Sequence, residues 1–381
     1  MKRKILVTTG TRAEYGILRP VLKAISRNDK LELFLVATGM HLSRKFGLTI
    51  SEIKKDGFKI YETINTIPKG NEPYFMSKAL GEAIIAFSRI FKKLKPDINL
   101  VFGDRDEMFA SAIAAYHMNI PNAHIHGGDK SGGIDEYTRH AITKISNIHF
   151  VATAKSKERV LRMGENSKYV FLTGSPTTDE IVNDKITRKE DLQRKYGLPF
   201  VGNEILLLQH PVTTEIEKTE EQIRNILNAI VRKGNTTIAI SPNSDAGHKK
   251  IFQYLKLYSR KYNFIKTFTT LPRSDYLGML KSCGVLVGNS SSGMIEAGYF
   301  NIPVVNVGIR QKDRERGKNV INVINESEDS IYHTIQKALK MKQRRSVVND
   351  AYGSGNVANK IVCYLEKISL DKNLIQKQII Y

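Results

Sequence analysis

The sequence has few of the residues that would support a disulfide-rich or membrane-spanning protein. Two of its 381 residues are cysteine and none is tryptophan. Cys283 and Cys363 cannot build a disulfide framework, and we interpret both as buried thiols in a reducing cytoplasm. No apolar stretch reaches the roughly 18 residues that a membrane-spanning helix needs. The apolar residues Ile5–Val7 after the basic start are too few for a signal-peptide core, so a cytoplasmic location is expected.

The formal net charge of +21 suggests a nucleic-acid partner, but the distribution of the charge argues against one. Lysine and arginine are spread along the chain, with no arginine-rich arm and no interleaving with aromatic residues. The densest clusters, at 92–95 and 340–345, fall where helices are expected to end, and cations there suit the helix dipole. We expect no nucleic-acid partner, because attraction of a small anionic ligand accounts for the charge equally well.

Apolar strands alternate with amphipathic helices through the first half, a pattern that indicates a parallel, doubly wound sheet. The periodicity predicts strands over residues 4–8, 31–38, 58–63, 98–102, 123–126 and 149–151, and helices over 16–27, 46–56, 76–93 and 108–118. Ligands of such sheets bind beyond the carboxyl ends of the strands. Polar clusters follow four of these strands, at 9–12, 39–41, 103–106 and 126–129.

The pattern restarts after Gly174-Ser175-Pro176, so we predict two Rossmann-like α/β domains that face a cleft, over residues 1–173 and 174–356. A final helix that starts at Val357, within residues 357–381, is expected to rejoin the first domain. The second half predicts strands over 204–209, 236–240, 263–266, 285–288 and 303–307, and helices over 185–196, 220–232 and 249–262.

The segment GNSSSGMIEA, from Gly288 to Ala297, follows a short β-branched run and begins a helical pattern. A strand that turns into a helix through small residues leaves backbone N–H groups for a phosphate, with the hydroxyls of Ser290, Ser291 and Ser292 as further donors. The same residues also suit an ordinary serine cap. Arg310 follows the next apolar run, and a fork-shaped cation beside a phosphate site suggests a nucleotide diphosphate.

Titratable side chains cluster in the first half. GTRAEYG, from Gly10 to Gly16, lacks the spacing of a nicotinamide fingerprint, but Arg12 in it suits an anionic ligand. Asp104 follows a strand among other acidic residues, and a carboxyl group beside other carboxylates keeps its proton to a higher pH, which suits a general acid or base. In HIHGGD, from His124 to Asp129, no histidine pair has metal-ligand spacing, so no metal is expected.

Nine motifs in order, GTRAEYG, ATGMHLS, GDRDE, HIHGGD, IDEYTRHAITK, QHPVTTE, PNSDAG, GNSSSGMIEA and RQKDRERGKNVI, resemble the hydrolysing UDP-N-acetylglucosamine 2-epimerase family of the sialic-acid pathway. The resemblance runs from Gly10 to about Asn359. It implies a two-domain fold of the glycosyltransferase-B type and a homodimer that needs no cofactor or metal. The implied reaction converts UDP-N-acetylglucosamine and water into N-acetylmannosamine and UDP, by elimination of UDP and hydration of a 2-acetamidoglucal.

The resemblance also implies roles for individual residues. Asp104 and Asp135 match acid/base carboxylates, with Glu136 and Arg139 on the same segment as Asp135. The residues that match positions around UDP are Arg12, His210, Asn243, Ser290, Ser291, Ser292, Glu296 and Arg310, with Glu296 on the ribose hydroxyls. His41 and Arg105 are expected near the sugar.

One departure concerns the catalytic acid. Many family members have glutamate where this chain has His126, and a second subset reads HIHGGE where this chain ends in Asp129. Either His126 performs the acid/base step or Asp129 does. The HIHGG pattern also resembles members that act on nucleotide-linked N,N'-diacetylbacillosamine for legionaminic acid. We place UDP-N-acetylglucosamine first, that sugar second, and a glycosyltransferase of the same fold or a nucleotide-sugar sensor after them.

Overall fold

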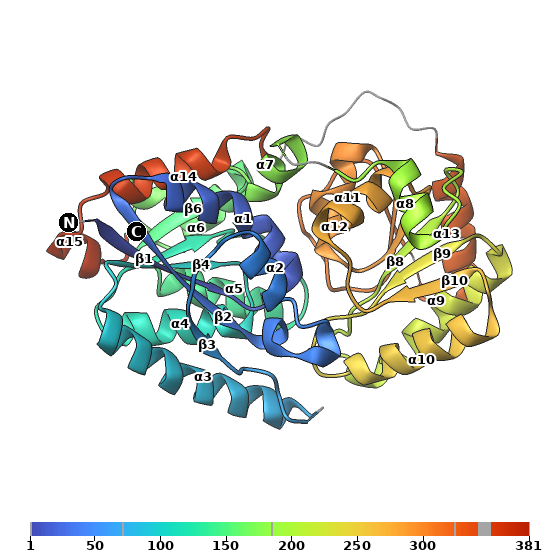
Figure 1. Ribbon diagram of the computed structural model, residues 1–381, viewed down its shortest axis with the longest axis horizontal. Coiled ribbons are helices and arrows are strands. Elements are labelled where there is room, and N and C mark those ends of the chain that lie inside the picture. The colour runs from blue at the N-terminus through green and yellow to red at the C-terminus, as the bar shows by residue number, and fades with distance from the viewer. Residues whose placement is uncertain (1, 71, 184–185, 324, 342–351, 381) are drawn as a thin grey trace. The chain divides into compact units, whose positions relative to one another are not determined.

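A buried parallel sheet forms the centre of the first of two units. In the computed structural model, which describes residues 2–70, 72–183, 186–323, 325–341 and 352–380, its strand order is β3-β2-β1-β4-β5-β6-β7 (Figure 1). The strands are β1 (Arg3–Thr9), β2 (Leu31–Thr38), β3 (Ile60–Ile64), β4 (Ile98–Phe102), β5 (Asn122–Ile125), β6 (Ile148–Val151) and β7 (Val170–Leu172). Every neighbouring pair is parallel. Across the sheet the strand numbers fall from β3 to β1 and then rise from β4 to β7, so the direction of the strand order reverses between β1 and β4.

Helices cover both faces of this sheet, because successive strand residues point to opposite sides. Ile5 and Val7 of β1 pack in one core, whereas Leu6 packs in another with residues of α3 and α4. The helices are α1 (Arg12–Arg27), α2 (Ile50–Lys55), α3 (Pro73–Leu94), α4 (Asp106–His117), α5 (Ile134–Lys144), α6 (Ala154–Arg162), α7 (Pro176–Asn183), α14 (Val357–Lys367) and α15 (Lys372–Ile375). Short 3₁₀ turns are η1 (Gly39–Leu42), η2 (Arg44–Phe46) and η3 (Ser167–Tyr169).

The second unit repeats the design with the strand order β10-β9-β8-β11-β12-β13, again parallel throughout. Its strands are β8 (Ile205–Leu208), β9 (Thr237–Ile240), β10 (Ile265–Phe268), β11 (Val285–Gly288), β12 (Val304–Asn306) and β13 (Val320–Asn322). Its helices are α8 (Lys189–Tyr196), α9 (Thr219–Lys233), α10 (His248–Lys261), α11 (Arg273–Ser282), α12 (Ser291–Ile295) and α13 (Glu328–Lys340), with 3₁₀ turns η4 (Ile216–Lys218) and η5 (Ala297–Phe300). The order reverses between β8 and β11.

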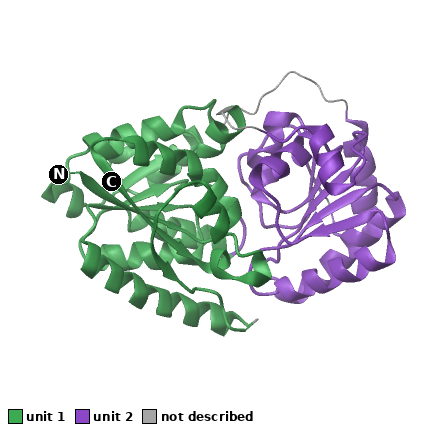
Figure 2. Cartoon of the chain, in the orientation of Figure 1, with its two compact units in different colours: residues 1–130, 134–183, 351–381 green, residues 131–133, 184–350 purple. Residues whose placement is uncertain are grey.

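The units divide the chain as Met1–Lys130, Ile134–Asn183 and Ala351–Tyr381 in the first, and Ser131–Gly133 and Asp184–Asp350 in the second (Figure 2). Helix α14 belongs to the first unit, where it packs on α1 and α7. The boundary lies after Asn183 rather than at Gly174. Helix α7 stays in the first unit because it caps α14. The buried Asp179 of α7 accepts hydrogen bonds from the backbone of Val357 (2.9 Å) and Ala358 (2.6 Å), the first two residues of α14.

The α/β class predicted from the periodicity is confirmed, and the differences lie mainly at element ends. Helix α1 begins at Arg12 instead of Gly16, because Thr11 caps it by accepting from the backbone of Glu14. The segment predicted as a helix over 185–196 forms α8 from Lys189, and residues 184–185 lie outside the described residues.

The interpretation of both cysteines as buried is wrong for Cys363. Cys363 lies on the exposed side of α14, whereas Val362 and Leu365 of the same helix are buried. None of the helices in the described ranges is long and apolar enough to span a bilayer.

Candidate active site

Four of the predicted site residues lie at the point in each sheet where the strand order reverses. Arg12 follows β1, and Asp104 follows β4, its neighbour across the reversal in the first unit. In the second unit His210 follows β8 and Ser290 follows β11. Parallel α/β sheets bind ligands at such positions, beyond the carboxyl ends of the strands. Each unit therefore has its own candidate half-site.

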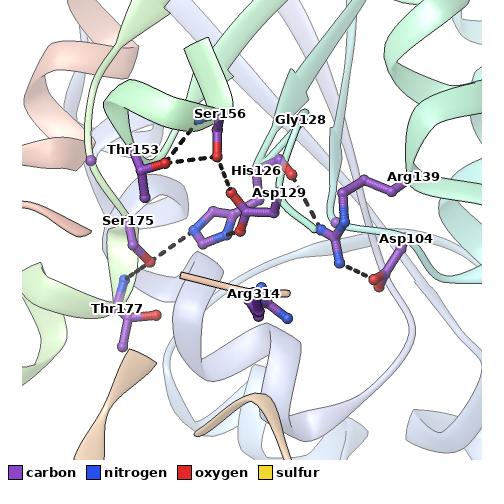
Figure 3. A network of polar contacts seen from close by, with 12 residues as sticks. Asp104, His126, Gly128, Asp129, Arg139, Thr153, Ser156, Ser175, Thr177 and Arg314 are labelled. Carbon is purple, nitrogen blue, oxygen red and sulfur yellow. Dashed lines mark hydrogen bonds and ion pairs between the residues drawn. The ribbon is translucent and has the colours of Figure 1, made fainter. Parts of the chain in front are cut away.

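Asp104 is paired with Arg139 of α5, as Figure 3 shows. Arg139 is 2% exposed, and its Nη1 also donates to the backbone oxygen of His126 at 3.2 Å. The Asp104 side chain is 21% exposed and therefore within reach of a ligand. The expectation for Asp104 named only the neighbouring carboxylates, whereas the partner seen here is the guanidinium of Arg139.

Asp135 and Glu136 lie in the first turn of α5, ahead of Arg139, and both are partly exposed. Glu136 Oε1 lies 2.9 Å from His140 Nε2, one helical turn away. The sequence motif therefore places two accessible carboxylates on the same helix as the arginine that holds Asp104.

His126 and Asp129 are buried and contact each other. His126 Nδ1 lies 3.0 Å from Asp129 Oδ2, and its Nε2 lies 2.8 Å from the hydroxyl of Ser175 (Figure 3). The other oxygen of Asp129 accepts from Ser156 Oγ at 2.7 Å. The side chains of His126 and Asp129 are 1% and 0% exposed. His126 also has a left-handed backbone, with φ of 65°, so the loop is tightly bent at this residue.

Two further predicted residues, Arg12 and His41, form hydrogen bonds within the first unit. Arg12 Nε donates to Glu52 of α2 at 2.7 Å. His41 is fully buried, with Nε2 3.1 Å from Thr9 Oγ1 and Nδ1 2.8 Å from Thr49 Oγ1. Burial lowers the pKa of His41 to about 4, so its ring is neutral at physiological pH.

Arg105 lies beside Asp104, where β4 leads into α4. Its Nε and Nη2 donate to the two carboxylate oxygens of Glu107 at 3.1 and 3.4 Å. The arginine side chain is 20% exposed while Glu107 is buried. A planar fork held from behind in this way can present its outer edge to a ligand.

Asn289 organises the half-site of the second unit. Its side chain accepts from the backbone N–H of His210 (2.8 Å) and donates to the backbone oxygen of the same residue (2.8 Å). Its own backbone oxygen accepts from Arg310 Nη1 (3.5 Å) and Gln311 Nε2 (3.1 Å). His210 Nδ1 in turn accepts from the backbone of Asn243 at 3.2 Å. The side chain and backbone oxygen of the buried Asn289 therefore join the ends of β8 and β11 to the loop after β12.

The three serines that begin α12 differ in their surroundings. Ser290 caps the helix by accepting from the backbone of Ser292, and Ser291 is partly exposed. The Ser292 hydroxyl contacts Tyr276 and donates to Glu296 Oε2. Arg273 donates to the other oxygen of Glu296 at 2.6 Å. The predicted ribose carboxylate is therefore held by a buried network on α11 and α12.

Sequence reasoning missed four of these residues: Ser175, Arg273, Tyr276 and Asn289. Asn289 lies inside the GNSSSG motif, so its position between a strand and a serine cap was a usable signal. Ser175, Arg273 and Tyr276 act on residues 49, 23 and 16 positions away, and no local pattern indicates such pairs. In the part of the chain that the structure describes, no three metal-ligating side chains come together as a metal site would require.

Comparisons with known proteins show similarity along nearly the whole chain. The family model described as UDP-N-acetylglucosamine 2-epimerase matches residues 23–366. A UDP-N,N'-diacetylbacillosamine 2-epimerase (hydrolyzing) of Legionella pneumophila is 38% identical over 99% of both chains. A UDP-N-acetylglucosamine 2-epimerase of Neisseria meningitidis is 33% identical over 96% of this chain and 95% of that protein.

A solved structure shares the fold as well. The UDP-GlcNAc 2-epimerase from Neisseria meningitidis bound to UDP-GlcNAc superposes with a TM-score of 0.78 at 19% identity, over 96% of this chain and 100% of that one. The two parallel sheets described above therefore have the arrangement of strands and helices found in epimerases of the glycosyltransferase-B type. The full-length matches leave one conclusion: the chain belongs to the UDP-N-acetylglucosamine 2-epimerase family, whose relatives include hydrolysing enzymes.

Proposed function

We propose that the protein hydrolyses a UDP-linked 2-acetamido sugar to UDP and the free sugar with inverted C2. The observation that carries the proposal is the Asp104–Arg139 pair, a partly exposed carboxylate bound by a buried guanidinium at the switch point of the first sheet. Asp104 takes the C2 proton while the C1–O bond breaks and UDP leaves, which gives a 2-acetamidoglucal. Water then adds at C1, and a proton is delivered to C2 from the opposite face.

The second proton needs a group other than Asp104, since it arrives on the other face of the sugar. His126 and Asp129 are buried and bonded to each other, so they suit a structural role better than a proton transfer to substrate. Asp135 and Glu136 are partly exposed, and we assign the second acid to Asp135, the position that the family resemblance implies. Arg139 orients Asp104 through their ion pair.

The nucleotide is assigned to the second unit. Arg310 and the hydroxyls of Ser290 and Ser291 would bind the diphosphate, and His210 and Asn243 would complete the nucleotide site. Glu296, fixed by Arg273, keeps lone pairs for the ribose hydroxyls. A homodimer in the cytoplasm, as the family resemblance implies, remains an expectation.

Two sugars are candidates, and we favour the diacetamido sugar. The Legionella relative that is named for UDP-N,N'-diacetylbacillosamine is 38% identical, against 33% for the Neisseria relative named for UDP-N-acetylglucosamine. The HIHGGD motif points in the same direction. This order reverses the one drawn from the motifs alone, and UDP-N-acetylglucosamine stays as the second candidate.

The test is to incubate purified protein with each donor separately, without an acceptor, and to measure released UDP and the free sugar by NMR. We expect UDP and the C2-inverted sugar in equal amounts, faster from the diacetamido donor. UDP release only after an acceptor is added would identify a glycosyltransferase. Binding of both donors without any UDP release would identify a sensor.

A further inference from the structure

Two buried glutamates at the switch point of the first unit have no part in the mechanism above. Glu14 lies in the first turn of α1 and Glu107 in the first turn of α4, the helices that follow β1 and β4. They are 5% and 4% exposed. The sequence motifs GTRAEYG and GDRDE contain them, but nothing in the proposed chemistry needs a carboxylate at either position.

The two side chains converge on Gly10, where β1 has just ended. The N–H of Gly10 donates to Glu14 Oε2 at 3.3 Å, and a Cβ on Gly10 would lie 2.9 Å from the carboxyl carbon of Glu107. Gly39, the first residue of η1 after β2, encloses Glu107, because a Cβ there would lie 2.4 Å from Glu107 Oε1. Its φ of 55° also favours glycine. The space around the pair is therefore shaped for two carboxyl groups.

The charge of the pair is only partly balanced. Arg105 holds both oxygens of Glu107, as described above, whereas Glu14 is held by neutral donors, the backbone N–H of Gly10 and the side chain of Thr9. The buried hydroxyl of Thr66 lies 3.2 Å from the Cβ position of Gly39 and has no hydrogen-bond partner among the described residues. A buried carboxylate without a cationic partner of its own is costly inside a protein. The geometry favours one negative charge on the pair and a proton on Glu14.

The surrounding groups support this assignment. Burial and the neighbouring Glu107 raise the pKa of Glu14 to about 8, and Arg105 opposes them without cancelling their effect. His41, which faces the pair from η1, is neutral because burial lowers its pKa to about 4. Arg12 on α1 is engaged with Glu52. Glu107, Arg105, His41 and Arg12 are the titratable or charged groups around Glu14, and they leave it neutral below about pH 8.

We propose that Glu14 is a positioning residue that acts as a neutral carboxylic acid, allowing Glu107 alone to carry the charge that holds Arg105 at the edge of the sugar site. When Glu14 loses its proton, the pair carries two negative charges and draws the guanidinium of Arg105 inward, away from the substrate. The inference rests on the proposed function, because it assumes that Arg105 contacts the sugar.

The first test is the pH dependence of kcat and KM between pH 6 and 10 for the wild type, Glu14→Gln and Glu14→Ala. Above about pH 8 the wild-type kcat/KM should fall about tenfold per pH unit, mainly through KM. Glu14→Gln imitates the neutral acid and should change less than about threefold up to pH 9.5. Glu14→Ala should be impaired at every pH. Coincident alkaline declines in the wild type and Glu14→Gln, or no decline in the wild type, would overturn the proposal.

A second measurement needs no substrate, so that it separates this proposal from the proposed function. The pKa of Glu14 rises from its ordinary value of 4.5 to about 8 on folding. Its contribution to stability is therefore fully present below pH 4.5 and is lost as the pH rises to 8. The Tm of Glu14→Gln minus that of the wild type should increase between pH 5 and 8 and then level off. Glu32→Gln, an exposed glutamate on β2, is the matched control.

The two measurements together assign a failure to one idea or the other. A Tm difference that does not change with pH overturns the neutral acid. The expected Tm curve in a protein that turns over neither donor supports the neutral acid and rejects the proposed function instead.

Discussion

His126 Nδ1 lies 3.0 Å from Asp129 Oδ2, and this contact joins two residues that the sequence presented as alternatives. The His126 ring also stacks on Tyr352, whose backbone oxygen accepts from the N–H of Ser175 at 2.7 Å. Ser175 precedes α7, and Tyr352 precedes α14. The histidine therefore contacts Ser175 by a hydrogen bond and Tyr352 by ring stacking, and these two residues lie on either side of residues 184–350 in the sequence.

This contact changes what substitution of the pair should do. From the sequence alone, one of His126→Gln and Asp129→Asn should stay near the wild-type rate and the other should be crippled. Because the two groups contact each other, we now expect both variants to lose stability and the double variant to lose little more than the worse single one. Urea unfolding of the four proteins should give a coupling free energy of about 0.5–3 kcal/mol. Additive losses would separate the two residues and return the acid/base role to one of them.

Asp104→Asn should abolish turnover and leave nucleotide binding nearly unchanged. Loss of a general acid or base typically lowers a rate by about 10² to 10⁴, whereas Asp104 is not among the residues proposed to bind the nucleotide. The amide retains a hydrogen bond to Arg139, so the fold should tolerate the change. Calorimetry with UDP is the control measurement. A large loss of UDP affinity would mean that Asp104 organises the protein rather than the chemistry.

The periodicity predicted most of the fold, and it failed where distant residues decide. Strands β4 and β11 were predicted residue for residue, because each is a short apolar run with a glycine at its end. The residues of α5 were identified only as part of a motif, and no helix was predicted there. Arg139 of α5 pairs with Asp104, which lies 35 positions away in the sequence, and no local pattern indicates such a pair. Likewise, the sequence suggested Glu296 for the ribose but contained no sign that Arg273 holds it. Spacing indicates which residues share a strand end, whereas packing decides which of them touch.

Arg310→Ala should act on binding rather than on the chemical step. The arginine donates to the backbone oxygen of Asn289, which places its guanidinium beside the serine turn of the second unit. Hydrogen bonds to charged groups contribute about 1.5–3 kcal/mol, so KM should rise tenfold or more. Arg310→Lys should recover only part of the loss, because an ammonium group lacks the planar fork. An unchanged KM and unchanged inhibition by UDP would exclude a diphosphate contact.

The isotope content of the products should report the order of bond breaking. Elimination of UDP removes the C2 proton, and the later reprotonation draws on solvent, so sugar made in heavy water must carry deuterium at C2. Water adds to C1 and never to phosphorus, so UDP released in ¹⁸O-water must carry no label. The accessible carboxylates Asp104, Asp135 and Glu136 motivate this prediction, since attack of water on phosphorus would not require them around a sugar. Mass spectrometry of both products, for the diacetamido and N-acetylglucosamine donors in parallel, measures the outcome. Sugar without deuterium at C2, or UDP with ¹⁸O, would exclude the elimination and leave a simple nucleotide-sugar hydrolase.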